Sequence, residues 1–457
     1  MPDEQKQFAN LDECVEHWRA HWNVPAISVG ILNGGDVDTR GYGIASMDTQ
    51  HPVTADTLFQ IGSISKVYTT TLVMILVDQG KLDLDELVTT YLPSLKLKDE
   101  NALKVITLRH LVTHTSGVFG DFFDDFGMGD DALARYVEAM SELRQIYQPG
   151  ELWSYTNSGF NLAGYIVEKA LDKPFEDAMR ELLIEPAGFE HTFQFAVEAI
   201  TYPLAVGHVH PDPEDEDTLE IARRYPLPRT SHAAGGIIST VGDLLKFAQL
   251  HMNNGAVDGK QVLSEAGVKA MQQPQVKAAG LADEWGLGWM IFDVDGTKAI
   301  GHGGTTNGFQ AALRIVPERN FAISILTNGD RGHAAEKPIL DWALQHHLGL
   351  APKERQEVML EPHQLDRLVG KYAQKMADVI ISSGEGSLKM DYFARSALAD
   401  SDEPKKMPTA ELMPVGELDF IVTNGPSVGS LVDFIETDSG DIRFIRVGGR
   451  FADRVTE

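Results

Sequence analysis

The sequence predicts an α/β protein in which an antiparallel sheet is flanked by helices, with an inserted helical subdomain and a small all-β unit after it. Strand patterns stand at both ends of the first 350 residues, and helical patterns fill the region between them. A charged, proline-bracketed stretch then precedes short alternating runs. We therefore expect a domain over 1–349, a linker over 350–364 and a β domain over 365–457.

The first domain begins with an amphipathic helix over 8–22, whose Leu11, Val15 and Trp18 share one face. Asn33-Gly34-Gly35 then joins two strands, which is a strong hairpin signal. The expected strands of this domain cover 26–32, 37–44, 299–302, 309–316 and 321–327. Because the early and late strands flank a helical region, we expect them to share one sheet.

Helical patterns dominate the middle of the chain. The expected helices cover 67–79, 108–113, 160–171, 174–183, a segment capped by Thr240 and Asp243, and 336–347. After residue 364 the pattern changes to short runs separated by glycine, aspartate and proline, at 379–381, 388–390, 420–422, 431–435 and 442–447. These runs predict a sandwich or a barrel.

Composition limits the function. The formal net charge is −28, from 39 Lys and Arg against 67 Asp and Glu, so the surface repels phosphate backbones and anionic lipid. We therefore expect no nucleic-acid partner and no membrane partner. Cys14 is the one cysteine, which excludes an intrachain disulfide and favours a buried structural thiol. The polar start of the chain lacks a secretory signal, so we expect a cytoplasmic protein.

The first chemistry-bearing motif is Ser63-Ile-Ser-Lys66, which lies where a strand pattern meets an apolar helix. At the helix N-terminus the Ser63 N–H can stabilise an oxyanion. Lys66 falls one turn later on the same side, so its amine can reach the serine hydroxyl. A desolvated lysine loses its proton more easily and can activate a serine. A serine cap beside a surface lysine is the plainer interpretation of this motif alone.

Two further motifs strengthen the functional interpretation. Tyr155-Thr-Asn157 follows a Pro-Gly turn, and its side chains are expected to alternate on an extended loop so that both point one way. A phenol beside an ammonium can act as a general base. The third motif, His302-Gly303-Gly304, ends a strand in small residues where a ligand backbone can lie close. An aromatic plug and a glycine-rich turn are the alternatives.

In this order the three motifs resemble the penicillin-recognising serine hydrolases, and most closely the branch of class C β-lactamases, DD-peptidases, D-aminopeptidases and family VIII esterases. The segment at 108–117, Leu-Arg-His-Leu-Val-Thr-His-Thr-Ser-Gly, is similar to that branch, as are 233–240 and 326–329. The resemblance covers about residues 10–348. The region from Leu368 to Phe451 looks like the lipocalin-like barrel appended to several of these peptidases.

The resemblance implies a role for each residue. Ser63 is the acylated nucleophile, Lys66 and Tyr155 share the proton transfers, and Asn157 holds Lys66 and the substrate amide. The oxyanion hole is expected from the N–H groups of Ser63 and Thr305. The sequence departs from the β-lactamase pattern at His302 and Gly303, where that pattern has lysine and threonine. A neutral imidazole holds a carboxylate less well than an ammonium does, which counts against penicillinase activity.

Other candidate residues lie outside these motifs. Phe119, Asp121 and Phe122 belong to a loop of alternating aromatic and acidic residues, which either binds part of a substrate or is a solvated loop. Gly303 and Gly304 are further candidates for substrate binding. His110 and His114 stand four apart, but capping or packing explains them better than a metal. We expect no metal and no organic cofactor.

The sequence thus predicts a serine hydrolase that acts through a Ser63 acyl-enzyme on small esters or amides, of carboxylesterase or D-amino-acid peptidase type. Two alternatives remain open, a β-lactamase or transacylase of the same fold, and a binding module without catalysis. The expected partner is a small ester, amide or peptide substrate. The sequence leaves the oligomeric state open, with a homo-oligomer among the options.

Overall fold

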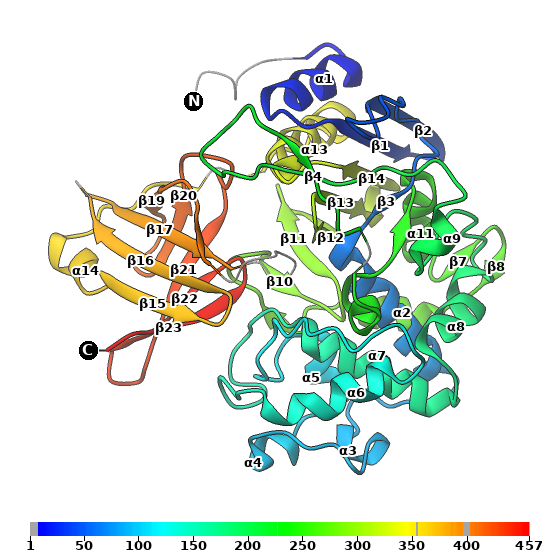
Figure 1. The fold of residues 1–457 in the computed structure, drawn as a ribbon, viewed down its shortest axis with the longest axis horizontal. Coiled ribbons are helices and arrows are strands. Elements are labelled where there is room, and N and C mark those ends of the chain that lie inside the picture. The colour runs from blue at the N-terminus through cyan, green and yellow to red at the C-terminus, as the bar shows by residue number, and fades with distance from the viewer. Residues whose placement is uncertain (1–7, 226, 353–354, 385, 396–402, 457) are drawn as a thin grey trace. The chain divides into compact units, whose positions relative to one another are not determined.

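The computed structural model describes residues 8–225, 227–352, 355–384, 386–395 and 403–456 (Figure 1). The chain divides into two compact units. The first comprises the residues up to Val209 together with Leu219–Val276 and Glu284–Pro352, and the second comprises His210–Thr218, Lys277–Asp283 and the region beyond residue 352. The segments His210–Thr218 and Lys277–Asp283 therefore group with the C-terminal region. The predicted domains were consecutive stretches of chain and did not include this grouping.

The first unit is built on an antiparallel sheet in the order β2-β1-β14-β13-β12-β11-β10-β9. Its strands are β1 (Ala26–Asn33), β2 (Asp36–Gly43), β9 (Val276–Lys277), β10 (Glu284–Trp285), β11 (Met290–Val294), β12 (Thr297–Thr306), β13 (Phe309–Val316) and β14 (Phe321–Thr327). β1 pairs with β2 through the predicted hairpin and with β14, from Ile27↔Thr327 to Asn33↔Phe321. The prediction that early and late strands share one sheet is confirmed.

Helices cover both faces of this sheet. Ile27, Val29 and Ile31 of β1 belong to the same buried cluster as residues of α1 and α13, whereas Gly30 faces Val241 of α11. The α-helices of the first unit are α1 (Leu11–His21), α2 (Ser65–Asp78), α3 (Val88–Tyr91), α4 (Glu100–Leu103), α5 (Leu108–Val112), α6 (Ala132–Ala139), α7 (Asn157–Leu171), α8 (Phe175–Met179), α9 (Ala196–Ala199), α10 (His232–Gly235), α11 (Val241–Met252), α12 (Glu265–Met271) and α13 (Gly332–Leu348). Burial on both faces explains the continuous apolar run of β1.

Shorter elements complete the first unit. They are the 3₁₀ turns η1 (Gly62–Ile64), η2 (Met140–Glu142), η4 (Arg229–Ser231) and η5 (Pro317–Arg319), the π-turn η3 (Arg180–Ile184), and the strand pairs β3 (Phe59–Gln60) with β6 (Ile238–Ser239), β4 (His208–Val209) with β5 (Glu220–Ile221), and β7 (Ala256–Val257) with β8 (Lys260–Gln261). The predicted cap is present, because Thr240 Oγ1 accepts a hydrogen bond from Asp243 N at 3.3 Å. The predicted helix at 174–183 is α8 followed by the π-turn.

The second unit is a closed antiparallel barrel. Eight of its strands form a ring, which the pairing of β16 with β17 closes, and β18 adds to β17 outside the ring. Its elements are α14 (Pro362–Asp366), β15 (Gly370–Gln374), β16 (Ala377–Ser383), β17 (Leu388–Ala394), β18 (Lys405–Lys406), β19 (Ala410–Pro414), β20 (Asp419–Val422), β21 (Leu431–Glu436), β22 (Ile442–Val447) and β23 (Arg450–Arg454). Closure leaves no strand edge open in the ring, and the expected small all-β barrel is confirmed.

Candidate active site

Ser63 lies in η1, the single 3₁₀ turn that leads from β3 into α2. The turn depends on Gly62, which has φ of +49°, a conformation that favours glycine. Ser63 is partly exposed, whereas Gly62 and Ile64 on either side are buried. The α2 helix behind it is buried almost all round, from Ser65 to Leu76. A rigid, buried helix therefore presents one accessible hydroxyl at its start.

Lys66 lies one helical turn after Ser63, as the spacing predicts. Its side chain is fully buried, and its Nζ lies 3.0 Å from Ser63 Oγ. The same nitrogen lies 2.7 Å from Asn157 Oδ1 and 2.6 Å from the carbonyl oxygen of Ala234. An ammonium has three hydrogens to donate, and these three oxygen atoms accept them. The lysine is thus held in one position against the serine.

Tyr155 and Asn157 approach Lys66 from the helical region. The Tyr155 ring is 5% exposed, and its centroid lies 4.9 Å from Lys66 Nζ. Asn157 is the first residue of α7, so the expectation that it shares an extended loop with Tyr155 is wrong. The helix begins three residues before the predicted start at residue 160. The apolar pattern missed Asn157, Ser158 and Gly159 because they are polar or small, although they are buried.

Asp121 fixes the orientation of the Asn157 amide. Asn157 Nδ2 donates to Asp121 Oδ1 at 2.8 Å, and Asp121 is 6% exposed. Because a carboxylate accepts and an ammonium donates, the amide oxygen must face Lys66 and the amide nitrogen must face Asp121. Sequence reasoning placed Asp121 among substrate-binding candidates, and the structure places it behind Asn157 instead.

The other two loop candidates lie in different surroundings. The Phe122 ring is 5% exposed and packs against Tyr136, with ring centroids 4.7 Å apart. Phe119 is partly exposed, and its carbonyl oxygen accepts from Ser158 Oγ at 2.7 Å. Phe122 is thus a core residue of the helical region, whereas Phe119 anchors the loop beside the start of α7.

The surroundings of Tyr155 include two aromatic residues to which sequence reasoning gave no role at the site. His114 stacks on Tyr155 with ring centroids 4.3 Å apart, and its Nδ1 accepts from Thr156 N at 2.9 Å. Trp285 of β10 lies 6.0 Å from Tyr155 and 5.5 Å from His302 between ring centroids. His114 stood in a recognisable motif, but an isolated tryptophan on a two-residue strand gives no sequence signal. The expected packing role of His114 and the capping role of His110 are both seen.

His302 lies on β12 beside Tyr155 and Trp285 and is 3% exposed. Its Nδ1 lies 2.5 Å from the Gly303 carbonyl oxygen, so Nδ1 carries the proton and donates. Its Nε2 has no hydrogen-bond partner within the described part of the chain. Burial, and then the charge of Lys66, lowers the pKa of His302 to about 3. The imidazole is therefore neutral at physiological pH.

The glycines after His302 allow β12 to approach the nucleophile. A Cβ on Gly304 would lie 1.9 Å from the Ile61 carbonyl oxygen and 3.1 Å from Ser63 N, whereas a Cβ on Gly303 would meet only Ala311 O, at 3.7 Å. Gly304 thus packs on the nucleophile turn, and Gly303 is partly exposed. The predicted strand end at His302 is wrong, because small residues extend β12 to Thr306.

Thr305 N lies next to the nucleophile turn. A Cβ built on Gly62 would come within 2.6 Å of this nitrogen. The β12–β13 hairpin closes on Thr306↔Phe309 through a two-residue turn, which makes that pair a hydrogen-bonded one. Because N–H directions alternate along a strand, the Thr305 N–H points away from β13. The N–H groups of Thr305 and Ser63 thus both lie at the nucleophile turn.

This arrangement can perform acyl transfer. It contains an accessible hydroxyl, a buried amine in contact with it, a phenol beside the amine, and two backbone N–H groups suited to a developing oxyanion. Among the described residues, no group of three His, Cys, Asp or Glu side chains is placed to hold a metal ion. None of the described helices combines the length and apolar character needed to cross a bilayer.

Comparisons with known proteins agree with the fold and the motifs. The family described as "Beta-lactamase" matches residues 11–347. "Penicillin-binding protein 4" of Amycolatopsis lactamdurans is 35% identical over 332 residues, which cover 70% of this chain and 85% of that protein. The chain therefore belongs to the beta-lactamase family. It is an enzyme, a serine hydrolase related to beta-lactamases and penicillin-binding proteins.

Several solved structures match nearly the whole chain. The crystal structure of SurE is 25% identical with a TM-score of 0.74, over 97% of this chain and 98% of that one. The octameric penicillin-binding protein homologue from Pyrococcus abyssi is 22% identical with a TM-score of 0.68, over 97% and 98%. The combination of hydrolase fold and C-terminal barrel therefore recurs in proteins of known structure.

Proposed function

We propose that this enzyme hydrolyses small, neutral esters or amides through an acyl-enzyme on Ser63. The observation that carries the proposal is the 3.0 Å contact between Ser63 Oγ and Lys66 Nζ, with the lysine buried and held by Asn157 Oδ1 and Ala234 O. A lysine that is buried and fixed in this way does not fit the alternative of a serine cap beside a surface lysine. It is suited to take part in proton transfer with a nucleophilic serine. The ordered motifs and the family membership support the same assignment.

The proposed reaction has two steps. Ser63 Oγ attacks the substrate carbonyl carbon while its proton passes to the Lys66–Tyr155 pair, and the N–H groups of Ser63 and Thr305 stabilise the oxyanion. The carbonyl then re-forms, and the leaving alcohol or amine departs with that proton. Water next attacks the acyl carbon and gives a proton to the same pair. The bond from that carbon to Ser63 Oγ then breaks, the pair returns the proton to Oγ, and the acid leaves. No cofactor takes part in these steps.

The substrate class follows from His302. A β-lactam carries a carboxylate that is best held by a fixed positive charge, and a charge-assisted hydrogen bond is about twice as strong as a neutral one. Because the pKa of His302 is lowered to about 3, the imidazole offers no such charge. Neutral esters need none, so we expect this enzyme to favour them over penicillins. A transacylase, in which an amine or alcohol replaces water, remains a second outcome of the same acyl-enzyme.

The first test compares substrates and labels. We expect a fluorophosphonate to add one mass equivalent to the wild-type chain and none to Ser63→Ala. We also expect kcat/KM for p-nitrophenyl acetate to exceed that for nitrocefin at pH 7.5, and His302→Lys to shift the ratio towards nitrocefin. Labelling of a folded Ser63→Ala chain would refute the nucleophile. A wild-type preference for nitrocefin would instead favour a penicillin-directed enzyme, as the name of the Amycolatopsis relative suggests.

The pH dependence gives a separate check on His302. A histidine with an ordinary pKa near 6.5 would gain charge as the pH falls from 8 to 5, and the nitrocefin-to-acetate ratio would rise over that window. With its pKa lowered to about 3, His302 stays neutral throughout, so the ratio should stay flat. A rise centred near pH 6.5 in the wild type, absent in His302→Gln, would contradict the proposal.

The homologue from Pyrococcus abyssi is described as octameric. We propose that this chain also forms a homo-oligomer. The molar mass in solution, measured by light scattering at several concentrations, tests it directly.

A further inference from the structure

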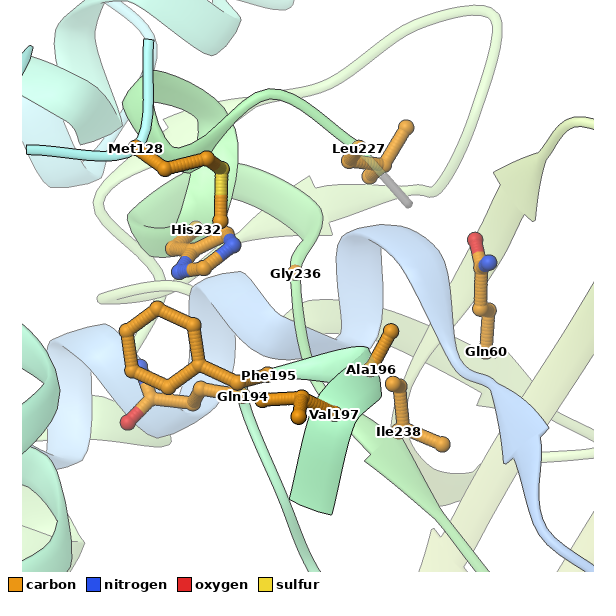
Figure 2. A pocket seen from close by; sticks show the side chains of 10 residues that line it. All are labelled: Gln60, Met128, Gln194, Phe195, Ala196, Val197, Leu227, His232, Gly236 and Ile238. Atoms are coloured by element: carbon orange, nitrogen blue, oxygen red, sulfur yellow. The ribbon is translucent and has the colours of Figure 1, made fainter. Parts of the chain in front are cut away.

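A pocket of about 220 Å³ lies in the first unit beside the nucleophile turn (Figure 2). In the figure, Gln60 lies at one side and His232 with Phe195 at the other, with Gly236 between them. An apolar cavity of about 150 Å³ can hold a benzene ring, so this pocket has room for one phenyl or isobutyl group. None of the site residues discussed above lines it.

The pocket wall is continuous with the backbone of the catalytic site. Gln60 lies three residues before Ser63 and pairs with Ile238. Gly236 lies two residues after Ala234, whose carbonyl oxygen accepts from Lys66 Nζ at 2.6 Å. A Cβ on the intervening Gly235 would lie 3.8 Å from the carbonyl carbon of Gly62. The segment that holds the catalytic lysine therefore also forms one side of the pocket.

The lining is mainly apolar, with two buried amides. Phe195, Leu227 and Ile238 supply apolar surface. Gln60 and Gln194 are 4% and 5% exposed, and Gln60 Oε1 and Gln194 Nε2 have no hydrogen-bond partner within the described residues. A buried polar atom without a partner is costly, so these two atoms are suited to a polar group of a bound ligand.

Beneath the pocket a buried ion network holds His232 in place. His232 Nδ1 lies 2.8 Å from Glu176 Oε1, and Arg229 contacts both carboxylate oxygens of Glu176 at 3.1 and 3.0 Å. Arg229 Nη1 also lies 2.7 Å from Asp130 Oδ1. The two buried groups of this network, Arg229 and Glu176, pair with one another, and His232 is held against the pocket by the same carboxylate.

Two of the lining residues carry exposed apolar side chains. Met128 and Val197 are 56% and 75% exposed. Exposed apolar surface beside a pocket is typical of a ligand-binding groove.

The position of the pocket decides which part of the substrate it takes. Lys66 Nζ contacts Tyr155 on one side and Ala234 O on another, and the pocket is formed from the Ala234 segment. The leaving group accepts a proton from the Lys66–Tyr155 pair and so departs on the Tyr155 side. We infer that the pocket binds the acyl side of the substrate, and that the preferred acyl group carries an apolar, leucine- to phenylalanine-sized side chain. This inference rests on the proposed function.

The test varies the acyl group and keeps the leaving group constant. The substrates are p-nitrophenyl acetate and p-nitrophenyl 3-phenylpropanoate, and we expect the wild type to favour the second by tenfold or more in kcat/KM, about 1.4 kcal/mol. Ala196→Phe places a ring in the pocket from α9, and it should lower that preference at least tenfold with acetate turnover kept within threefold. Ile200→Phe introduces the same ring at a position that is 70% exposed and is not among the residues that line the pocket, so this control should alter neither rate.

Val197→Trp at the exposed rim provides a second variant that does not depend on repacking a buried position. It should also lower the preference for phenylpropanoate. If both variants keep the wild-type preference, or if the wild type has none, the pocket does not bind the acyl group. Failure of the proposed function gives a different result, because a folded Ser63→Ala chain would then still hydrolyse p-nitrophenyl acetate.

Discussion

At the scale of single residues, Lys66, the proposed partner of the nucleophile, contacts an amide that can take only one orientation. Asn157 accepts from Lys66 through Oδ1 and donates to Asp121 through Nδ2. If the amide were reversed, an N–H group would face the Lys66 nitrogen and an oxygen would face a carboxylate. The Asp121 carboxylate therefore fixes the orientation of the Asn157 amide, which is one of the three groups that hold Lys66.

This arrangement predicts the effect of Asp121→Asn. An asparagine can offer a donor where the carboxylate could only accept, so the Asn157 orientation loses its constraint. Loss of one hydrogen bond to a charged group costs about 1.5–3 kcal/mol, so we expect kcat to fall by roughly 10- to 100-fold. The measurement is steady-state hydrolysis of p-nitrophenyl acetate at pH 7.5.

The control for this prediction is Asp124→Asn, an exposed carboxylate in the same loop, which should leave kcat unchanged. Circular dichroism of both variants separates a local effect from unfolding. A wild-type kcat in folded Asp121→Asn would show that Asn157 is oriented without the carboxylate.

The sequence allowed Ser63, Lys66, Tyr155, Asn157 and His302 to be predicted as one site, because three motifs occur in a recognisable order. Their mutual placement could be predicted only in part. The spacing of Ser63 and Lys66 is local to one helical turn, whereas the contacts of Tyr155 with His114 and Trp285 join segments far apart in the chain. Such contacts depend on tertiary packing and produce no periodic pattern in the sequence from which they could be predicted.

At the scale of elements, β12 and η1 meet through glycine. A side chain on Gly304 would overlap the Ile61 carbonyl oxygen, and one on Gly62 would overlap Thr305 N. Both glycines stand where the nucleophile turn touches the strand. Because neither glycine has a side chain, the strand and the turn can come close enough to bring together the two N–H groups proposed for the oxyanion hole.

Two neighbouring substitutions test this contact. In Gly304→Ala the new methyl group would lie 1.9 Å from Ile61 O, so strand and turn must separate by about 1 Å or more. A displacement of that size can cost about a hundredfold in rate. Gly303→Ala meets its nearest neighbour at 3.7 Å, an ordinary contact, and should keep kcat/KM within about threefold. Equal ester hydrolysis by the two variants would disprove the packing role of Gly304.

Elements with a strong local pattern were predicted well, and those without one were not. The hairpin at Asn33–Gly35 was found from its turn residues, and the strands at 309–316 and 321–327 from their strand-like runs. The strands β9 and β10 are two residues long, which is too short for any periodicity. They form because β11 offers a sheet edge to extend, and that edge exists only after the fold has assembled.

At the scale of the whole molecule, the described residues form separate apolar cores. The barrel core, which includes Tyr372, Phe420 and Phe434, contains only residues after 364. The clusters on the two faces of the large sheet contain only residues before 351. A core that shares no residue with another can lose its packing by itself.

Separate cores predict separate unfolding transitions. Phe434 is 2% exposed, so Phe434→Ala should destabilise the barrel by about 3–5 kcal/mol and lower one calorimetric transition. Ester hydrolysis at 25 °C should be unchanged. Phe247→Ala, which removes a fully buried ring from the first unit, should lower the other transition. One transition that shifts equally in both variants would show that the units unfold together.

The pairing of β1 with β14 also determines when the enzyme can become active. About 290 residues separate these neighbouring strands along the chain, from Asn33 to Phe321. During synthesis the β1–β2 hairpin emerges before its partner strand, so the edge of β1 stays unpaired until β14 has emerged. The turn that carries Ser63 likewise lacks its contact with β12 until that strand has been made. A nascent chain therefore carries the proposed nucleophile through much of translation before the strand that completes the proposed oxyanion hole has emerged.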